Sequence, residues 1–208
     1  MQDCVFCGPR PDLEMYLAKG NLFYTIPKGQ ICAGHTLMVT TEHLKCYASL
    51  DVSAENEYYE RKQNLSDILT RHFGNLFMIE YGVWGQTVKH AHKHFIPLEG
   101  PKHKVESVFE EMVSPGNILA EVADRARLRH VFGQEKGYVW LEEHGVSRII
   151  HTLGIPDDRT CKHLLYRHFF AVVKGVGVLT WGKMTEEQKR EDENNREETR
   201  KVLMSVKL

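Results

Sequence analysis

The chain has 208 residues, 42% of them hydrophobic, so it is long enough to bury a core and fits one domain or one domain with a large appendage. Its 27 lysines and arginines nearly balance its 28 aspartates and glutamates, so no overall charge favours nucleic acid or an acidic membrane surface. The composition therefore argues against a nucleic-acid-binding protein.

The start of the chain, MQDCVFCGPR, lacks a basic stretch followed by an apolar run, and no window approaches the roughly 18 consecutive apolar residues of a membrane span. We therefore expect no membrane segment. Only two of the five cysteines are close together, which does not make a disulfide framework in a chain of this length. A reducing, cytoplasmic location is expected.

The first half of the chain reads as short strands around one helical pattern. We predict strands at residues 22–27, 35–40, 75–81 and 90–97, and a helix within residues 47–73. Gly29 and Gly34 lie in the turn between the first two strands, and Gly74 is placed to end the helix. Because the connections are short, neighbouring strands can pair, and the sequence predicts a mostly antiparallel α+β fold.

The second half gives weaker signals. We expect helices at residues 118–131 and 161–173, strands at residues 137–143 and 147–152, and a last helix with a capping box made by Thr185 and Gln188. The charged face of that last helix is expected to be solvated. We predict two regions, a first domain at residues 1–100 and a C-terminal α/β extension at residues 101–208 that packs on the same domain.

The segment HAHKHFIP places three histidines at alternate positions. Because side chains alternate across a strand, His90, His92 and His94 should all point to one face, with Lys93 on the other. They could be metal ligands, or a nucleophile with its helpers, or polar residues on a solvated strand. The last interpretation is weakened by the loop before the strand.

That loop is rich in glycine and ends where the histidines begin. It contains Gly82, Gly85, Gln86 and Thr87. Glycines let backbone N–H groups approach an anion closely, and glutamine and threonine side chains add neutral donors suited to phosphate oxygens. A phosphate beside imidazoles would make a reaction centre.

The runs GHTLMVTTEHL and GQTVKHAHKHFIP resemble the histidine triad (HIT) family of nucleotide hydrolases and transferases. The resemblance covers roughly residues 4–100 and is specific at its two ends, CVFC and the triad. It implies a HIT-like antiparallel sheet with two helices, in a protein that is often dimeric. Such a protein binds a purine nucleotide with its α-phosphate facing the triad.

Carried over position by position, the resemblance makes His92 the nucleophile that attacks the α-phosphorus to give a covalent nucleotidyl-histidine. The backbone carbonyl of His90 would hold its other ring nitrogen, as a nucleophilic neutral imidazole requires. His94 and His35 match histidines that contact phosphate oxygens and the leaving group, where they would stabilise developing charge. Related transferases and phosphorylases carry glutamine at the third position, so His94 favours hydrolysis.

Two positions depart from the family pattern. Lys93 stands where an apolar residue is usual, but we expect it to point away from the triad. Glu80 stands where relatives place an amide against phosphate, and a carboxylate there would repel phosphate. Either Glu80 contacts a ribose hydroxyl or a cationic leaving group, or the substrate is not an ordinary polyphosphate.

Cys4 and Cys7 have the spacing of a zinc knuckle, and without a second CxxC the other ligands must be histidines. The alternative is a pair of unbridged surface thiols. In zinc-bearing HIT relatives the matching histidines are His43 and His90. The resemblance thus implies a closed Cys2His2 site whose zinc is structural.

The leading hypothesis is a nucleotide hydrolase that cleaves at the α-phosphate of a dinucleoside polyphosphate, a phosphoramidate or another nucleotidyl conjugate. The alternatives are a nucleotidyltransferase with the same intermediate, a non-catalytic nucleotide sensor, and a metal-dependent hydrolase in which His90, His92 and His94 hold a catalytic zinc. We expect a nucleotide as the partner, no nucleic acid and no membrane, and a possible homodimer.

Overall fold

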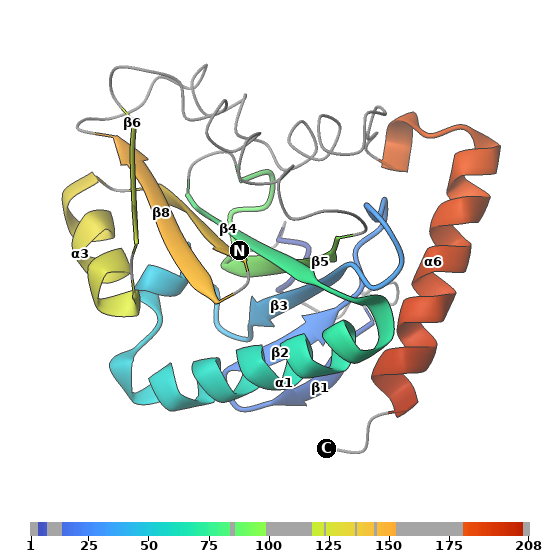
Figure 1. The fold of residues 1–208 in the computed structure, drawn as a ribbon, viewed down its shortest axis with the longest axis horizontal. Helices are drawn as coiled ribbons and strands as arrows, with labels where there is room; N and C mark the ends of the chain where they lie inside the picture. The colour runs from blue at the N-terminus through green and yellow to red at the C-terminus, as the bar shows by residue number, and fades with distance from the viewer. Residues whose placement is uncertain are drawn as a thin grey trace.

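The computed structural model describes residues 4–7, 14–83, 86–98, 118–122, 124–135, 137–143, 145–152 and 181–205. Within these residues the strands form one eight-stranded sheet in the order β1-β2-β3-β5-β4-β7-β8-β6, and all its pairings are antiparallel (Figure 1). The strands are β1 (Tyr16–Lys19), β2 (Leu22–Thr25), β3 (Thr36–Thr40), β4 (Leu76–Gly82), β5 (His92–Pro97), β6 (Ile118–Val122), β7 (Tyr138–Glu143) and β8 (Val146–Thr152).

The helices are α1 (Glu55–Phe73), α3 (Arg125–Glu135) and α6 (Glu186–Ser205), with short 3-10 helices η1 (Tyr47–Ser49), η2 (Val52–Ala54) and η3 (Trp181–Lys183). The α+β class predicted from the sequence is confirmed. As expected, α1 ends at Gly74, whose φ of 87° suits glycine and whose N–H donates to the carbonyl of Thr70 at 3.0 Å.

Helices α1 and α3 pack on the same face of the sheet and bury the main core. Leu65 and Leu69 of α1 and Leu128 of α3 lie in one apolar cluster with Phe95 and Trp140 of the sheet. The opposite face carries a smaller cluster of Phe23, Leu37 and Val39. Because alternate residues of a strand face opposite sides, this second face also receives the histidines of β5.

The C-terminal strands extend the same sheet. Strand β7 pairs along the length of β4, so the parts of the chain on either side of residue 100 share one sheet. The strands predicted at residues 137–143 and 147–152 are confirmed as β7 and β8. The helix predicted at residues 118–131 is wrong in its first part, because residues 118–122 pair with β8 as an edge strand before α3 begins.

Helix α6 begins as predicted with a capping box, in which the N–H of Gln188 donates to Oγ1 of Thr185 and the N–H of Thr185 donates to Oε1 of Gln188. Most of its charged residues are exposed or half-buried, as a solvated face requires. The prediction missed a buried stripe at helical spacing, which consists of Asp192, Arg196, Thr199 and Leu203. The helix predicted at residues 161–173 lies outside the described residues.

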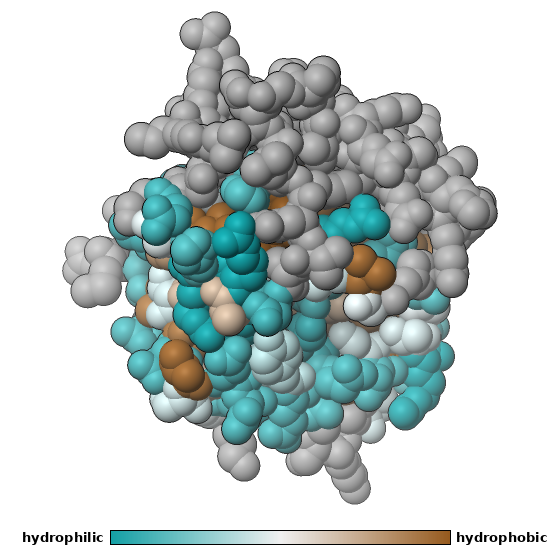
Figure 2. Space-filling view, turned by 60° about the vertical axis from the view of Figure 1, so that its left-hand side comes forward, coloured by the Kyte–Doolittle hydropathy of each residue, from teal (hydrophilic) through white to brown (hydrophobic). Residues whose placement is uncertain are grey.

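Most of the described surface on the face in Figure 2 is hydrophilic or of intermediate hydropathy, with hydrophobic residues in separate spots. Among the helices that the structure describes, none is long and apolar enough to cross a membrane.

Candidate active site and metal centre

Strand β5 lies between β3 and β4 and places two histidines on the face away from α1. His94 stands opposite Leu37 on one neighbouring strand and Ile79 on the other, and His92 stands opposite Val39. The two imidazole rings lie 5.1 Å apart between centroids. The expectation that one strand carries all three histidines needs a correction, because β5 begins at His92 and His90 precedes it.

The ring of His92 is held by the backbone just before it. Its Nδ1 atom lies 2.6 Å from the carbonyl oxygen of His90. A carbonyl can only accept, so Nδ1 donates its proton and the Nε2 atom of the neutral ring keeps a lone pair. Burial lowers the pKa of His92 to about 4, which keeps the ring neutral near pH 7. The arrangement leaves Nε2 as a nucleophilic nitrogen.

His94 is held by a second histidine, His35, which directly precedes β3. The Nε2 atom of His35 lies 3.0 Å from the Nδ1 atom of His94, and the backbone N–H of Ile31 donates to Nδ1 of His35 at 3.2 Å. Because Nδ1 of His35 accepts, its proton is on Nε2, which donates to His94. The proton of a neutral His94 ring is then on its Nε2 atom, which makes that atom a hydrogen-bond donor.

This geometry changes the expected place of His35. The resemblance implied a direct contact with phosphate or the leaving group, but both ring nitrogens of His35 are engaged inside the protein. His35 is also fully buried, whereas His92 and His94 keep 6% and 5% of their surface exposed. The structure therefore places His35 behind His94.

Four residues far apart in the sequence meet beside this pair. Cys4, Cys7, His43 and His90 offer ligand atoms that all lie within 4.8 Å of one another, and the group could hold a metal ion. The Sγ atom of Cys7 lies 3.0 Å from Nδ1 of His43 and 3.2 Å from Nδ1 of His90, and the Sγ atom of Cys4 lies 3.5 Å from Nδ1 of His90. The sequence placed the same four residues in one site.

The donor set fits a tetrahedral metal. Zn–S bonds of about 2.3 Å and Zn–N bonds of about 2.0–2.1 Å put sulfur and nitrogen ligands roughly 3.5 Å apart. The Nε2 atom of His90 lies 2.7 Å from the carbonyl oxygen of Thr40, so it carries the ring proton and leaves Nδ1 with a lone pair toward the cysteines. Burial, together with the neighbouring Cys4, raises the pKa of the Cys7 thiol to about 11. A bound cation would favour the thiolate.

The same group argues against a catalytic metal held by three histidines. Within the described residues, the candidate metal group contains His90 but neither His92 nor His94. The Nδ1 atom of His92 is engaged by a carbonyl and the Nδ1 atom of His94 by another histidine. The three histidines therefore do not form one metal site: His90 lies in the candidate metal group, and His92 and His94 do not.

The loop before β5 is described in part. Gln86 is buried, and its Nε2 atom donates to the carbonyl of Lys45 at 2.8 Å, while Thr87 is exposed. Gly85 lies outside the described residues. Among the described residues of this loop, the Gln86 side chain therefore bonds to the backbone of the segment before η1.

The structure does not bring Glu80 to the histidines. Glu80 pairs with Lys93 across β4 and β5, and both are fully buried on the face covered by α1. Oε1 of Glu80 accepts the backbone N–H of Tyr47 at 2.7 Å and the hydroxyl of Tyr138 at 2.9 Å. The expectation that Glu80 contacts a substrate therefore needs a correction, because its side chain lies on the other side of the sheet.

Lys93 points away from the triad, as expected, and enters a buried cluster that the sequence did not reveal. Its ammonium group is paired with Glu142, lies 3.1 Å from the hydroxyl of Tyr58 and sits 3.4 Å from the ring centre of Trp140. Glu142 is also paired with Lys62 of α1. The cluster therefore ties α1 to the middle of the sheet.

The antiparallel sheet and the paired histidines on its face away from α1 define an α+β protein with a histidine site on one side of the sheet. A family model described as "Protein similar to CwfJ C-terminal" matches residues 1–110, more than half of the chain, and the chain belongs to this family. Comparison with curated proteins gave no match.

The solved structures that are similar to this chain include the following three. A Hit-like protein involved in cell-cycle regulation from Bartonella henselae shares 18% identity at a TM-score of 0.38, over 42% of this chain and 72% of its own. A hypothetical histidine triad nucleotide-binding protein from Sulfolobus tokodaii shares 22% identity at 0.36, over 43% and 65%. Yeast Ap4A phosphorylase Apa2 shares 12% identity at 0.45, over 98% and 79%. At these low scores none of the three carries an argument about function.

Proposed function

We propose that the protein is a nucleotide hydrolase that cleaves at the α-phosphate of a nucleoside monophosphate derivative through a covalent intermediate on His92. The observation that carries the proposal is the 2.6 Å contact between Nδ1 of His92 and the carbonyl oxygen of His90. It fixes the ring in the tautomer whose Nε2 lone pair is available for attack. A dinucleoside polyphosphate, a phosphoramidate or another nucleotidyl conjugate would be the substrate.

The proposed reaction has two balanced steps. In the first, the Nε2 lone pair of His92 forms a bond to the α-phosphorus, and the bond to the leaving group breaks with its electron pair on the leaving atom. That atom accepts a hydrogen bond from the Nε2–H of His94, which keeps its proton, and a basic leaving group takes a proton from solvent. In the second, a water oxygen bonds to phosphorus, the N–P bond breaks, and the lone pair returns to His92. The water's released proton goes to solvent.

The remaining residues have supporting roles in this proposal. His94 donates to the phosphate oxygens and the leaving group. His35 holds His94 in the required tautomer. The loop with Gly85, Gln86 and Thr87 supplies neutral donors for phosphate, and no role is proposed for Glu80 in substrate binding.

We propose that the Cys4, Cys7, His43 and His90 group holds a structural zinc ion. Two thiolates and two imidazoles are a common zinc set, and four protein ligands leave no open position for chemistry. The ion would tie the N-terminal segment to the start of β5. Since the carbonyl of His90 also holds His92, the metal and the nucleophile share one residue.

The decisive test is intact-mass analysis after quenching without acid, with a panel of adenylate, guanylate and cytidylate derivatives. The wild-type protein should gain one nucleotidyl group, and His92→Asn should gain none and lose several orders of magnitude in turnover, as for removal of an essential nucleophile. An adduct that persists in His92→Asn would contradict the mechanism. Nucleotide binding without turnover of any member would favour a sensor.

The acceptor decides between hydrolase and transferase. Turnover with water alone, unchanged when alcohols, phosphate or sugar phosphates are added, supports hydrolysis. Transfer to an added acceptor would support the nucleotidyltransferase.

A homodimer stays a prediction, and sedimentation analysis of the purified protein tests it.

A further inference from the structure

We propose that Asp192 and Thr199 of helix α6 are positioning residues for the histidine pair: they hold the loop of residues 29–34 so that it sets the tautomer of His35 and, through His35, that of His94. The catalytic consequence rests on the function proposed above. The structural part, control of the tautomers by α6, stands on contacts between described residues. These contacts form a chain from the helix to the site.

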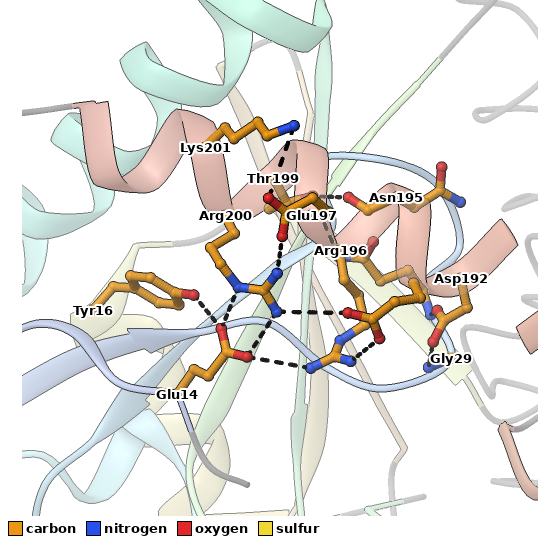
Figure 3. A network of polar contacts seen from close by, with 12 residues as sticks. Glu14, Tyr16, Gly29, Asp192, Asn195, Arg196, Glu197, Thr199, Arg200 and Lys201 are labelled. Atoms are coloured by element: carbon orange, nitrogen blue, oxygen red, sulfur yellow. Dashed lines mark hydrogen bonds and ion pairs between the residues drawn. The ribbon is translucent and has the colours of Figure 1, made fainter. Parts of the chain in front are cut away.

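The first contact is made by a buried carboxylate. Asp192 is 3% exposed, and its two oxygens accept consecutive backbone N–H groups, from Gly29 at 3.1 Å and Gln30 at 2.6 Å (Figure 3 shows the contact with Gly29). Hydrogen bonds to a charged acceptor are about twice as strong as neutral ones. Because both donors belong to the backbone, the contact fixes the direction of the loop where it leaves β2.

The second contact holds the other end of the loop. Thr199 is fully buried, and its Oγ1 atom accepts the N–H of Gly34 at 2.8 Å while donating to the carbonyl of Asn195 at 2.7 Å. The Nε2 atom of Gln30 also lies 3.4 Å from this oxygen. Asp192 and Thr199 are seven residues apart, two turns of one helix face, so α6 grips the loop at both ends.

The loop passes this constraint to His35. The side chain of Gln30 donates to the carbonyl of His35 at 2.8 Å, and the N–H of Ile31 donates to its Nδ1 atom at 3.2 Å. That N–H is the group that makes Nδ1 an acceptor and leaves the proton on Nε2, toward His94. If the loop rotates away, the N–H of Ile31 no longer fixes the His35 tautomer. The Nε2–H group of His35, from which His94 accepts a hydrogen bond, is then no longer guaranteed.

The same helix has a second anchor that serves as a matched control. Arg200 donates to Glu14, just before β1, at 2.8 and 2.9 Å, and Arg196 lies 3.7 Å from the same carboxylate (Figure 3). This anchor holds α6 to the N-terminal segment rather than to the loop of residues 29–34. If α6 acts only by stabilising the fold, loss of either anchor should have the same effect.

The test compares Asp192→Asn and Thr199→Val with Glu14→Gln, a charge loss at the second anchor, and with Thr199→Ser, which keeps the hydroxyl. Long-range 1H–15N correlation spectra of the imidazole rings report which nitrogen carries the proton. In the wild type, Nδ1 of His35 and of His94 should be unprotonated. Asp192→Asn and Thr199→Val should each give a mixture of tautomers at both rings, while Glu14→Gln and Thr199→Ser keep the wild-type pattern.

Kinetics gives a second measurement. On the substrate identified for the wild type, Asp192→Asn and Thr199→Val should lower kcat roughly 10- to 100-fold, as expected for misplacement by about 1 Å, with KM nearly unchanged. Thr199→Ser should restore most of kcat. Wild-type tautomers in both variants, or the same mixture in Glu14→Gln, would overturn the proposal.

The two proposals fail in different ways. If the wild type turns over no nucleotide, the spectra still decide whether α6 controls the tautomers. If the wild type forms the His92 adduct but the spectra do not respond to Asp192→Asn and Thr199→Val, the positioning role falls and the proposed function stands.

Discussion

The Nε2 atom of His35 and the Nδ1 atom of His94 lie 3.0 Å apart, with their ring centres separated by 5.2 Å. The contact joins the residue just before β3 to β5, and these two strands pair in the sheet. Since the other nitrogen of His35 accepts the N–H of Ile31, we expect His35 to influence a substrate through His94. This relationship makes a prediction that separates a positioning residue from a substrate contact.

We predict that His94→Ala lowers kcat roughly 100-fold, as for loss of one charge-stabilising donor. His35→Ala alone should also lower kcat, because His94 loses the partner that fixes its tautomer. The double variant should be no slower than His94→Ala, since His35 has nothing left to position. Multiplying losses in the double variant would instead mean that His35 contacts the substrate itself, as the family resemblance first implied.

The sequence predicted the parts of the site that depend on local spacing. Alternation along a strand placed His92 and His94 on one face, and the CxxC spacing together with the HIT resemblance placed Cys4, Cys7, His43 and His90 in one site. In both cases a short sequence pattern, together with the resemblance for the metal group, gives the residue types and indicates which side chains lie together.

What the sequence could not predict depends on contacts between distant segments. Whether Glu80 faces the histidines depends on the register of β4 against β5, and a shift of one residue reverses the face. The buried stripe of α6 was missed because it is mostly polar, and two of its residues, Asp192 and Thr199, contact backbone N–H groups, which leave no mark on the sequence of residues 29–34. Residues 118–122 form a strand because β8 offers an edge to pair with.

We predict about one tightly bound zinc per chain, and a large loss of metal in Cys4→Ser. Loss of a metal site is among the changes that cost about 4 kcal/mol or more, which corresponds to a fall in Tm of roughly 8–16 °C for a chain of this size. Metal analysis and thermal unfolding of both proteins measure this. The control is Cys46→Ser, at a buried cysteine outside the metal group, which should keep the metal. If chelation stops turnover without changing the Tm, the ion is not structural.

We predict that Gly34→Ala destabilises the protein by at least about 1 kcal/mol more than Gly74→Ala. Both glycines have positive φ, 85° and 87°, so both substitutions strain the backbone. A Cβ at Gly34 would lie 2.6 Å from the ring of Phe73 and 2.7 Å from Pro97, whereas a Cβ at Gly74 meets nothing within 4 Å. Urea unfolding gives the free energy of unfolding of the two variants. The difference between them measures the steric cost of a Cβ at Gly34, beside His35. Equal losses would show that the loop has room to adjust.

The last prediction concerns the buried charges under α1. Burial raises the pKa of Glu80 to about 7, although Lys93 and two hydrogen bonds oppose this shift. Between about pH 4.5 and pH 7 the folded state therefore keeps a proton that the unfolded chain releases, so this group's contribution to stability falls as the pH rises. Glu80→Gln replaces the titratable carboxyl group with an amide. The amide oxygen can still accept hydrogen bonds from the N–H of Tyr47 and the hydroxyl of Tyr138.

The stability of Glu80→Gln relative to wild type should rise by about 3 kcal/mol from pH 4.5 to pH 8, because a tenfold change in the acidity constant corresponds to about 1.4 kcal/mol. Urea unfolding at both pH values measures the difference. The control is Glu60→Gln, at an exposed position of α1, which removes the same charge from solvent rather than from the core. If the difference between wild type and Glu80→Gln is the same at pH 4.5 and pH 8, Glu80 is ionised in the fold throughout this range, and the ammonium of Lys93 compensates its burial in full.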